Sequence, residues 1–265
     1  FNKTEQVTVD LYGSLSLTGI GHATDLAVML GLSGADPEYV PIEDISTIID
    51  HIKSTNTIKF GNSVEIHFNP TDHIIFNKNF LPFHANGLTF TAHYENQQYV
   101  STFYSIGGGF VVKEESADNK DNDEIKSSFP YPVDKADELL AFCQQENKSI
   151  SELVYLNELS LRSSEEIDRE LMRIWNTMLE CIYTGCHSEG TLPGGLNVRR
   201  RAYDTYQKLK GHLPYNNPQE WLQTIRKTKV YFRQILKWVS CFALSVNEVN
   251  AALGRVVTAP TNGSA

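Results

Sequence analysis

The sequence predicts an α+β protein in which an N-terminal antiparallel sheet with helices is followed by an all-α C-terminal part. Within residues 1–112, apolar and polar residues alternate in several short runs, which is the pattern of half-buried strands. Residues 113–128 are too polar to fold alone, and after Pro132 the apolar residues recur at helical spacing. We therefore expect an α+β module at 1–112, a polar linker at 113–132 and a helical domain at 133–265.

Length, composition and charge exclude several classes of protein. The chain has 265 residues, enough for two domains that each bury a core. Its 41% hydrophobic and 21% charged residues are typical of a globular protein. The net charge of −9 argues against a nucleic-acid partner, because phosphates need a basic surface. No apolar run is long enough to span a membrane and the first residues form no signal sequence, so we expect a soluble, cytoplasmic protein.

The N-terminal elements follow from periodicity and turn signals. Alternation over 7–11 predicts a strand, and a glycine-rich turn follows it. Thr24 or Asp25 is the predicted N-cap of a short helix at 26–30, and an amphipathic helix is predicted at 43–53. Four further strands are predicted at 58–68, 73–76, 88–94 and 99–106. The histidines among them show no ligand-pair spacing, so we expect surface or edge positions for His67, His73, His84 and His93.

The C-terminal elements are predicted to be helices. The first covers 134–146, and capping boxes at Ser149 with Glu152 and at Ser163 with Glu166 predict the starts of two more. Gly185 is the predicted stop of the third helix. A fourth helix is predicted at 199–210. A helical region from Asn217 to Leu253 is longer than usual, so an interruption is expected around 227–231. We expect a core role for Trp221, Trp238 and Phe242.

Four residue groups could carry chemistry or be purely structural. The cysteines match no familiar zinc or ferredoxin spacing, so we expect no metal ligands and a structural role for Cys143, Cys181, Cys186 and Cys241. The basic cluster 199–201 suits a local anion or an ion pair. The loop 188–197 is either a connector or a site, with Glu189 and Asn197 as its polar handles. His22 lies just before a predicted helix N-terminus.

The segment 251–265 follows an apolar helix that presents Asn247 and Asn250 on one face. Thr261 and Ser264 offer hydroxyls, Asn262 offers an amide, and Gly263 leaves the backbone N–H groups open to a bound group. This set suits a carboxylate, above all where a helix begins just beyond it. The same residue types are also common in plain turns, and residue types alone leave both interpretations open.

Several blocks together resemble the bacterial iron–sulfur L-serine dehydratases, also called L-serine ammonia-lyases or deaminases. The blocks are 12–15 (YGSL), 18–25 (TGIGHATD), 104–110 (YSIGGGF), 188–196 with Arg199 to Arg201, and 251–264. The resemblance covers essentially the whole chain. It implies dehydration of L-serine to pyruvate and ammonia, in which a 4Fe–4S cluster acts as Lewis acid on the serine hydroxyl.

The resemblance also implies roles for individual residues. Thr261, Asn262, Gly263 and Ser264 would hold the substrate carboxylate. His22 would be an acid, a base or an orienting group, with Thr24 or Asp25 orienting it in turn. The family's N-terminal serine-rich block and its cluster cysteines have no match in these residues. We therefore expect a fragment whose cluster ligands lie outside the 265 residues and whose activity needs the complete chain.

The resemblance leaves a second function open. In the family the N-terminal module resembles an allosteric substrate-binding domain and mediates subunit contacts, which implies a homodimer. The alternative to a lyase is therefore a non-catalytic regulatory and dimerisation module that binds a small amino acid. A cluster-free binding protein for small hydroxy or amino acids is a third reading.

Overall fold

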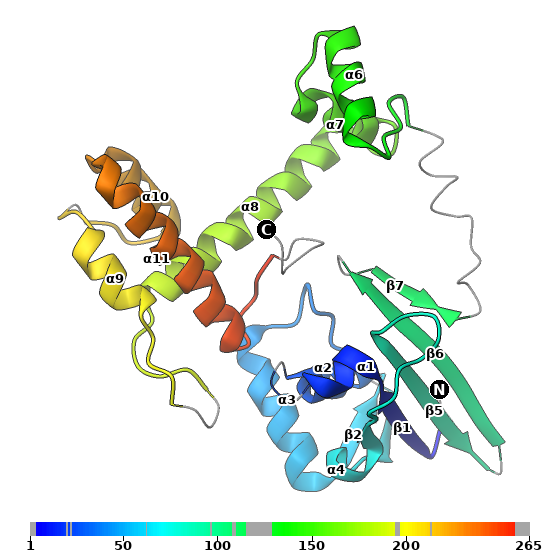
Figure 1. Ribbon diagram of the computed structural model, residues 1–265. Coiled ribbons are helices and arrows are strands. Elements are labelled where there is room, and N and C mark those ends of the chain that lie inside the picture. Colours follow the sequence, from blue (N-terminus) through cyan, green and yellow to red (C-terminus); the bar gives the residue numbers. More distant parts are fainter. Residues whose placement is uncertain are drawn as a thin grey trace.

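The computed structural model describes residues 4–19, 21, 23–61, 63–95, 97–107, 110–114, 129–193, 197–212 and 214–257. It confirms the α+β class. An N-terminal module (4–114) contains all the described strands, and a helical part (129–257) follows it (Figure 1). The domain boundaries predicted from composition stay a prediction, and 115–128 lie outside the described residues.

The large sheet of the N-terminal module has the strand order β4-β1-β5-β6-β7. Its strands are β1 (Gln6–Leu11), β4 (Ile74–Phe76), β5 (Gly87–Tyr94), β6 (Gln97–Gly107) and β7 (Phe110–Lys113). Three neighbouring pairs are antiparallel, but β1 and β4 run parallel, with Val9 opposite Ile74. The expectation of a purely antiparallel sheet is therefore wrong in this pair. The chain between them crosses over through helices, which a parallel pair requires.

The predicted strand at 58–68 is in fact a hairpin. Strands β2 (Thr57–Phe60) and β3 (Val64–His67) form a separate two-stranded sheet in which Ile58 lies opposite Ile66. Gly61 lies between them with φ of 55°, a left-handed conformation that glycine adopts without a steric penalty. The alternation of apolar residues continues across this turn, so periodicity alone did not separate the two strands.

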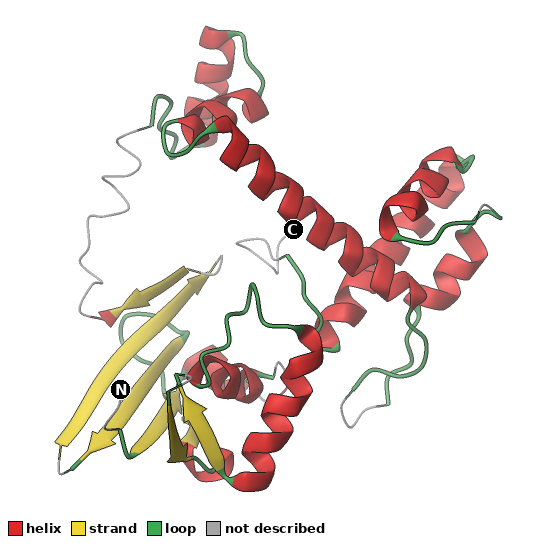
Figure 2. Ribbon diagram, turned by 180° about the vertical axis from the view of Figure 1, so that it is seen from behind, coloured by secondary structure: helices red, strands yellow, loops and turns green. Residues whose placement is uncertain are grey.

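The described residues of the module also form four helices: α1 (Gly13–Leu17), α2 (Thr24–Leu32), α3 (Ile42–Thr55) and α4 (Pro70–His73). Figures 1 and 2 show α2 and α3 on one side of the large sheet. The alternate side chains Val7, Val9 and Leu11 of β1 are buried in one core with Met29 of α2 and Ile52 of α3. Neither α1 nor α4 was predicted, because glycine and proline signals dominate those short segments.

Two local expectations in this module are wrong. The N-cap of α2 is Ala23, in the left-handed region with φ of 57° and with no side-chain cap, so neither Thr24 nor Asp25 caps the helix. His73 is buried rather than at the surface. Its Nε2 lies 2.9 Å from the Gln6 amide nitrogen, and its Nδ1 accepts from the backbone N–H of Asn69 at 3.2 Å. These two bonds replace the water that an exposed histidine would have.

The helical part is organised around the long helix α8 (Ser164–His187). Helices α6 (Ala136–Glu146) and α7 (Ile150–Leu159) lie at its N-terminal end (Figure 1). Helices α9 (Ala202–Leu209), α10 (Pro218–Lys227) and α11 (Phe232–Ala251) surround its C-terminal half. Their shared core contains Leu179, Cys186, Tyr206, Trp221, Trp238 and Cys241, with Phe242 packed against it, which confirms the three aromatic residues as core.

In the helical part, the two helix starts predicted from capping boxes are confirmed. Glu152 accepts from the backbone N–H of Ser149 at 2.7 Å, and Glu166 does the same for Ser163 at 2.9 Å. The interruption expected around 227–231 lies between α10 and α11. Gly185 is not a stop, because α8 continues to His187. A Cβ at Gly185 would lie 2.6 Å from the Cα of Ser245, so this glycine permits α11 to cross closely.

The two parts meet at the loop between α2 and α3. Arg173 of α8 forms an ion pair with Glu38, and its guanidinium carbon lies 5.7 Å from the centre of the Tyr39 ring. Arg255, just after α11, donates to the carbonyl oxygen of Val40. These contacts bring the end of α11 against the start of α3.

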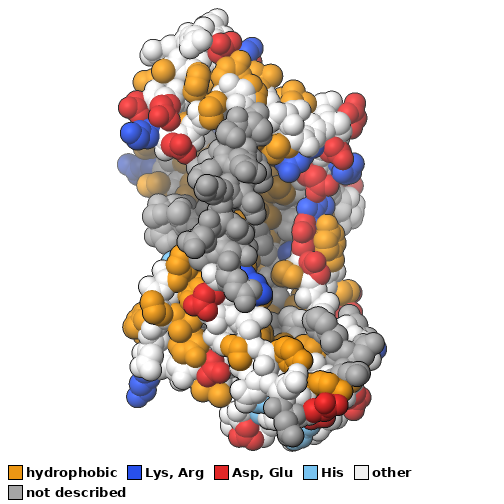
Figure 3. Space-filling model, turned by 90° about the vertical axis from the view of Figure 1, so that its right-hand side faces the viewer, with side chains coloured by type: hydrophobic (Ala, Val, Ile, Leu, Met, Phe, Trp, Pro, Cys, Tyr) orange, Lys and Arg blue, Asp and Glu red, His pale blue; other side chains and the backbone are white. Residues whose placement is uncertain are grey.

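Large apolar side chains are exposed on the last two strands of the module. They include Tyr99 and Val100 of β6 and Phe110 and Val111 of β7. Figure 3 faces this side of the molecule and shows apolar side chains among polar ones over its lower part. In the part of the chain that the structure describes, no helix combines the length and the apolar character needed to cross a membrane.

Candidate functional site

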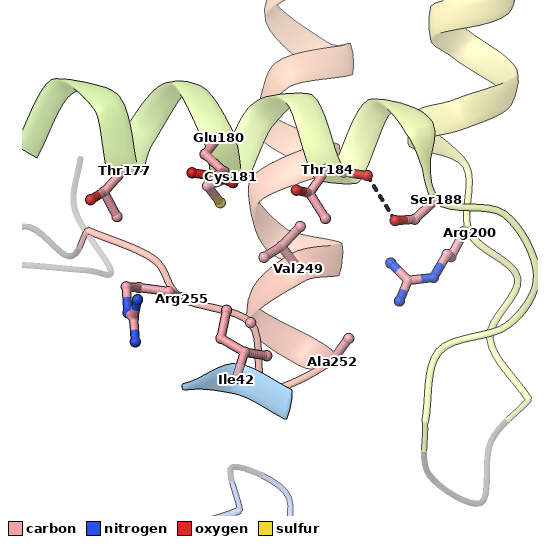
Figure 4. Close-up of a pocket in the computed structure, with 11 residues that line it drawn as sticks. Ile42, Thr177, Glu180, Cys181, Thr184, Ser188, Arg200, Val249, Ala252 and Arg255 are labelled. Atoms are coloured by element: carbon pink, nitrogen blue, oxygen red, sulfur yellow. Dashed lines mark hydrogen bonds between the residues drawn. The ribbon is translucent and has the colours of Figure 1, made fainter. Parts of the chain in front are cut away.

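The junction between the two parts contains two adjoining cavities, which we call together the junction cleft. The α8 cavity, about 340 Å³, lies between α8, α11 and the start of α3 (Figure 4). The α2 cavity, about 590 Å³, lies between α2, the following loop and the end of α11. Ile42, Gly254 and Arg255 line both cavities. Arg255 therefore stands between them.

One face of α8 forms the polar wall of the α8 cavity. Thr177, Glu180, Cys181 and Thr184 line it, at the helical spacing i, i+3, i+4 and i+7. Ser188 extends this wall, and its hydroxyl donates to the carbonyl oxygen of Thr184 at 2.7 Å (Figure 4). Burial raises the pKa of the Cys181 thiol to about 11, so it is uncharged near neutral pH and a weak nucleophile.

Two arginines supply positive charge to the α8 cavity. In Figure 4, Arg255 and Arg200 lie at opposite ends of it. Arg200 is held by a hairpin-like loop, in which its backbone N–H donates to the carbonyl oxygen of Gly190 at 2.9 Å. Glu180 is the one carboxylate among the described lining residues. Two guanidinium groups against one carboxylate favour a small anion, and a carboxylate fits the fork of donors that guanidinium presents.

The α2 cavity contributes side-chain amide groups and closely packed backbone to the junction cleft. Asn247 and Asn250 of α11 both line it, which confirms that their spacing places them on one face. Gly21 and Ala23 line its opposite side, so the chain on either side of position 22 faces the cavity. Helix α11 ends at Ala251, and Gly254 follows it; a Cβ on Gly254 would lie 3.0 Å from the carbonyl oxygen of Val249.

The predicted site residues fall into two groups. His22 and the predicted carboxylate binders Thr261, Asn262, Gly263 and Ser264 lie outside the described residues, and their roles stay predictions. Thr24 and Asp25 are the first residues of α2. The backbone N–H of Thr24 donates to the carbonyl oxygen of Gly19 at 2.9 Å, and neither residue is among those that line the two cavities. Their predicted orienting role also stays a prediction.

The sequence did not predict Arg255 or Glu180 as site residues, and it did not predict that Arg199 and Arg200 have different partners. Arg199 pairs with Asp204 at 2.8 Å, in line with the predicted ion pair. Arg200 lines the α8 cavity instead. The cluster was a usable signal for a cationic site, but three adjacent arginines give no indication of which one faces a cavity. Arg255 carried no local signal, because its partner Val40 is 215 residues away.

The described residues do not fit a metal or cluster site. Within them no group of three or more His, Cys, Asp or Glu side chains is placed to hold a metal ion. The sulfur atoms of Cys186 and Cys241 lie 3.9 Å apart in the helical core, and Cys143 is on α6, far along the chain from Cys181 in the cleft. Burial of Cys181, Cys186 and Cys241 agrees with a structural role for these three.

Comparison with known proteins covers both parts of the chain. Residues 1–116 match the family model of the serine dehydratase beta chain, and residues 145–265 match that of the serine dehydratase alpha chain. A curated relative, L-serine dehydratase of Haemophilus influenzae, is 40% identical over 268 residues, which cover 100% of this chain and 55% of the relative. L-serine dehydratase TdcG of Escherichia coli is 41% identical over 98% of this chain and 55% of its own length.

A third relative, L-serine dehydratase of Streptomyces coelicolor, is 41% identical over 98% of this chain and 54% of its own length. This chain thus spans about half the length of the curated relatives it matches. The two family models match in the order beta, then alpha, with residues 117–144 between them, and together they take in most of the sequence. The chain therefore belongs to the serine dehydratase family, with a beta-chain segment followed by an alpha-chain segment.

Proposed function

We propose that the protein is an L-serine ammonia-lyase, which converts L-serine to pyruvate and ammonia, and that the junction cleft binds the substrate. Relatives named L-serine dehydratase match this chain through both of its parts. The observation that carries the proposal for the site is the position of Arg255. It lines both cavities where the N-terminal module meets α8 and α11.

L-serine carries a carboxylate, an ammonium group and a hydroxyl, and the cleft offers a partner for each. Arg255 and Arg200 attract the carboxylate from the two ends of the α8 cavity, together with residues 261–264, whose role rests on the resemblance. Glu180 is the acceptor for the ammonium group. The amides of Asn247 and Asn250 orient the remaining polar atoms from the α2 side.

Elimination needs a base for the Cα proton and help for the departing hydroxyl. His22 is our candidate for the proton transfer, because its neighbours Gly21 and Ala23 line the α2 cavity. Cys181 is not a candidate base, since its thiol keeps its proton. The walls of the cleft hold the substrate in one orientation for that transfer, which lowers the barrier by proximity.

The resemblance implies a 4Fe–4S cluster that would polarise the serine hydroxyl as a Lewis acid when bound. The described residues do not fit such a cluster, because they include no set of three suitable ligands. None of the roles proposed for residues of the junction cleft depends on the cluster. The homodimer, the cytoplasmic location and amino-acid binding by residues 1–112 likewise remain proposals. The non-catalytic alternative is not favoured, because relatives named dehydratases match both parts.

The test is pyruvate release from L-serine by the natural protein that contains these residues, purified without oxygen and assayed for iron and sulfide. The Arg255→Ala substitution is expected to raise KM for L-serine at least about 10-fold, since it removes a charged hydrogen-bond donor. Arg226→Ala, an exposed arginine on α10, is the matched control and is expected to leave KM unchanged.

The outcomes separate the two parts of the proposal. A wild-type protein that binds no iron and releases no pyruvate would contradict the lyase assignment. Turnover with an unchanged KM in Arg255→Ala would keep the lyase and remove the substrate from the junction cleft.

A further inference from the structure

The buried carboxylate of Glu248 has no role in the site described so far. Glu248 is 3% exposed and belongs to α11, between the cavity-lining residues Asn247 and Val249. Its Oε1 accepts from the backbone N–H of Arg201 at 2.6 Å and of Ala202 at 3.2 Å. Its Oε2 is buried and has no hydrogen-bond partner among the described residues.

Glu248 caps α9 from a distant part of the chain. The first N–H groups of a helix have no acceptor within the helix, and a negative charge suits that end. The N-cap residue of α9, Arg201, provides no side-chain cap, so Glu248 of α11 accepts these N–H groups instead. A single hydroxyl would satisfy the same donors without burying a charge, so a capping role alone does not account for a buried carboxylate with one free oxygen.

The capped segment carries Arg200. Arg200 directly precedes Arg201 and Ala202, whose N–H groups Glu248 caps, and its side chain lines the α8 cavity. Its own backbone N–H is fixed to Gly190, and its Nη1 lies 3.5 Å from the carbonyl oxygen of Glu248. Arg200 is thus held directly by the loop and by the backbone carbonyl of Glu248, and the Glu248 carboxylate fixes the two residues that follow it. A shift of the chain at Arg201 would move the guanidinium out of its position in the cavity.

We propose that Glu248 is a positioning residue for substrate binding, and that its carboxylate fixes the backbone at Arg201 and Ala202 so that Arg200 meets the carboxylate of the substrate. This inference rests on the proposed function, because it needs Arg200 to contact L-serine. Glu248 itself does not touch the substrate. Its effect passes through Arg200 and belongs to binding rather than to the chemical step.

The experiment is a double-mutant cycle on the natural protein, with Glu248→Ala, Arg200→Ala and the two combined. KM and kcat for L-serine are measured, together with the dissociation constant of L-serine by calorimetry. Each single substitution is expected to raise KM about 10-fold and to change kcat by less than about threefold. The double variant is expected to have the KM of Arg200→Ala, because Glu248 has no further effect once its target is removed.

Two controls separate positioning from loss of stability. Glu248→Gln keeps an oxygen that accepts the two N–H groups and is expected to restore KM to within about threefold of wild type. Trp238→Phe disturbs the core of the helical part, whose residues include neither Glu248 nor Arg200, and is expected to lower the melting temperature with KM unchanged. If Glu248→Ala does not fold, Glu248→Asp, whose shorter side chain cannot reach both N–H groups, takes its place in the cycle.

Several results would overturn the inference. Additive effects of Glu248→Ala and Arg200→Ala on KM would show that Glu248 does not act through Arg200. An equal rise of KM in Trp238→Phe would leave only a structural role. A KM unchanged in Arg200→Ala removes the inference and leaves the lyase assignment intact. If the wild type releases no pyruvate, the lyase assignment is contradicted, and the mutant cycle is then evaluated from the dissociation constants of L-serine. If the wild type does not bind L-serine either, the inference is also overturned.

Discussion

At the scale of single residues, His187 shows how a polar side chain is accommodated in the helical core. Its Nδ1 lies 2.6 Å from the carbonyl oxygen of Tyr183, and its Nε2 lies 2.7 Å from the hydroxyl of Tyr215. The hydroxyls of Tyr215 and Tyr206 are 2.7 Å apart, and the indole N–H of Trp221 donates to Tyr206 at 2.9 Å. Desolvation lowers the pKa of His187, so the neutral ring is the form that this chain of hydrogen bonds holds.

The lowered pKa of His187 predicts a loss of stability in mild acid. The unfolded chain binds this proton near the ordinary pKa of 6.5, and the folded protein binds it only at lower pH. Stability is therefore complete above about pH 6.5 and falls as the pH drops toward the folded pKa. The measurement is thermal unfolding from about pH 7.5 to about pH 5, followed by tryptophan fluorescence. His187→Gln is expected to flatten this dependence, whereas the exposed control His212→Gln is not; stability that rises on acidification would contradict the assignment.

At the scale of elements, the crossing of α8 and α11 depends on a missing side chain. Gly185 lies inside α8, where glycine is unfavourable for helix formation, yet its position faces the backbone of Ser245. A methyl group there would lie 2.6 Å from the Cα of Ser245, and backbone cannot move away as a flexible side chain can. This crossing carries Asn247 and Asn250 to the junction cleft, so it also positions the site.

The Gly185→Ala substitution is expected to destabilise the helical part by about 3 kcal/mol, because it forces two helices apart. Gly31→Ala is the matched control. Gly31 also lies inside a helix, but nothing lies within 4 Å of a Cβ placed there, so alanine is expected to add about 0.5 kcal/mol of stability. Urea unfolding, followed by tryptophan fluorescence for Gly185→Ala and by circular dichroism for Gly31→Ala, measures both. Equal effects of the two substitutions would contradict the close crossing.

At the scale of the whole molecule, the N-terminal module and the helical part have separate cores. The core around Val9, Met29 and Ile52 and the core around Leu179 and Trp221 share no residue. The polar contacts described between the parts are exposed or half-buried: the Arg173 ion pair with Glu38, the contact of Arg173 with the Tyr39 ring and the Arg255 bond to Val40. Exposed ion pairs contribute little to stability, so the two cores are expected to unfold separately.

Substitution in one core should therefore leave the other unchanged. Ile52 is 2% exposed, and Ile52→Ala is expected to destabilise the N-terminal module by about 3 kcal/mol. All three tryptophans of the chain, Trp175, Trp221 and Trp238, belong to the helical part, so fluorescence reports that part alone. We expect Ile52→Ala to shift a transition seen by circular dichroism while the fluorescence transition stays in place. Leu179→Ala should shift the fluorescence transition and leave the transition of the N-terminal module in place. A single transition shifted by both variants would show that the cores are coupled.

Local sequence signals predicted the features that depend on neighbours along the chain. The boxes at Ser149 with Glu152 and at Ser163 with Glu166 are correct because both partners lie within one helical turn. Predictions failed where a distant segment decides. The buried His73 is paired with Gln6 of β1, 67 residues away, and the glycine at position 185, predicted as a helix stop, instead faces the backbone of Ser245 in α11. Thr24 and Asp25 are suitable capping residues, but the N-cap is Ala23 with its left-handed backbone, so the helix starts one or two residues earlier than predicted.

The sequence by itself determined the α+β class, the order of sheet module and helices, and the resemblance to the serine dehydratases. Periodicity, caps and motifs depend only on residues that are near one another along the chain. Only the tertiary structure decided which charged groups meet. Arg255 reaches Val40 across 215 residues, and Glu248 caps the helix after Arg201 across 47. Nothing in a linear pattern encodes such pairs, since a carboxylate or guanidinium has the same local signature on the surface and in a core, and packing of the helices selects its partner.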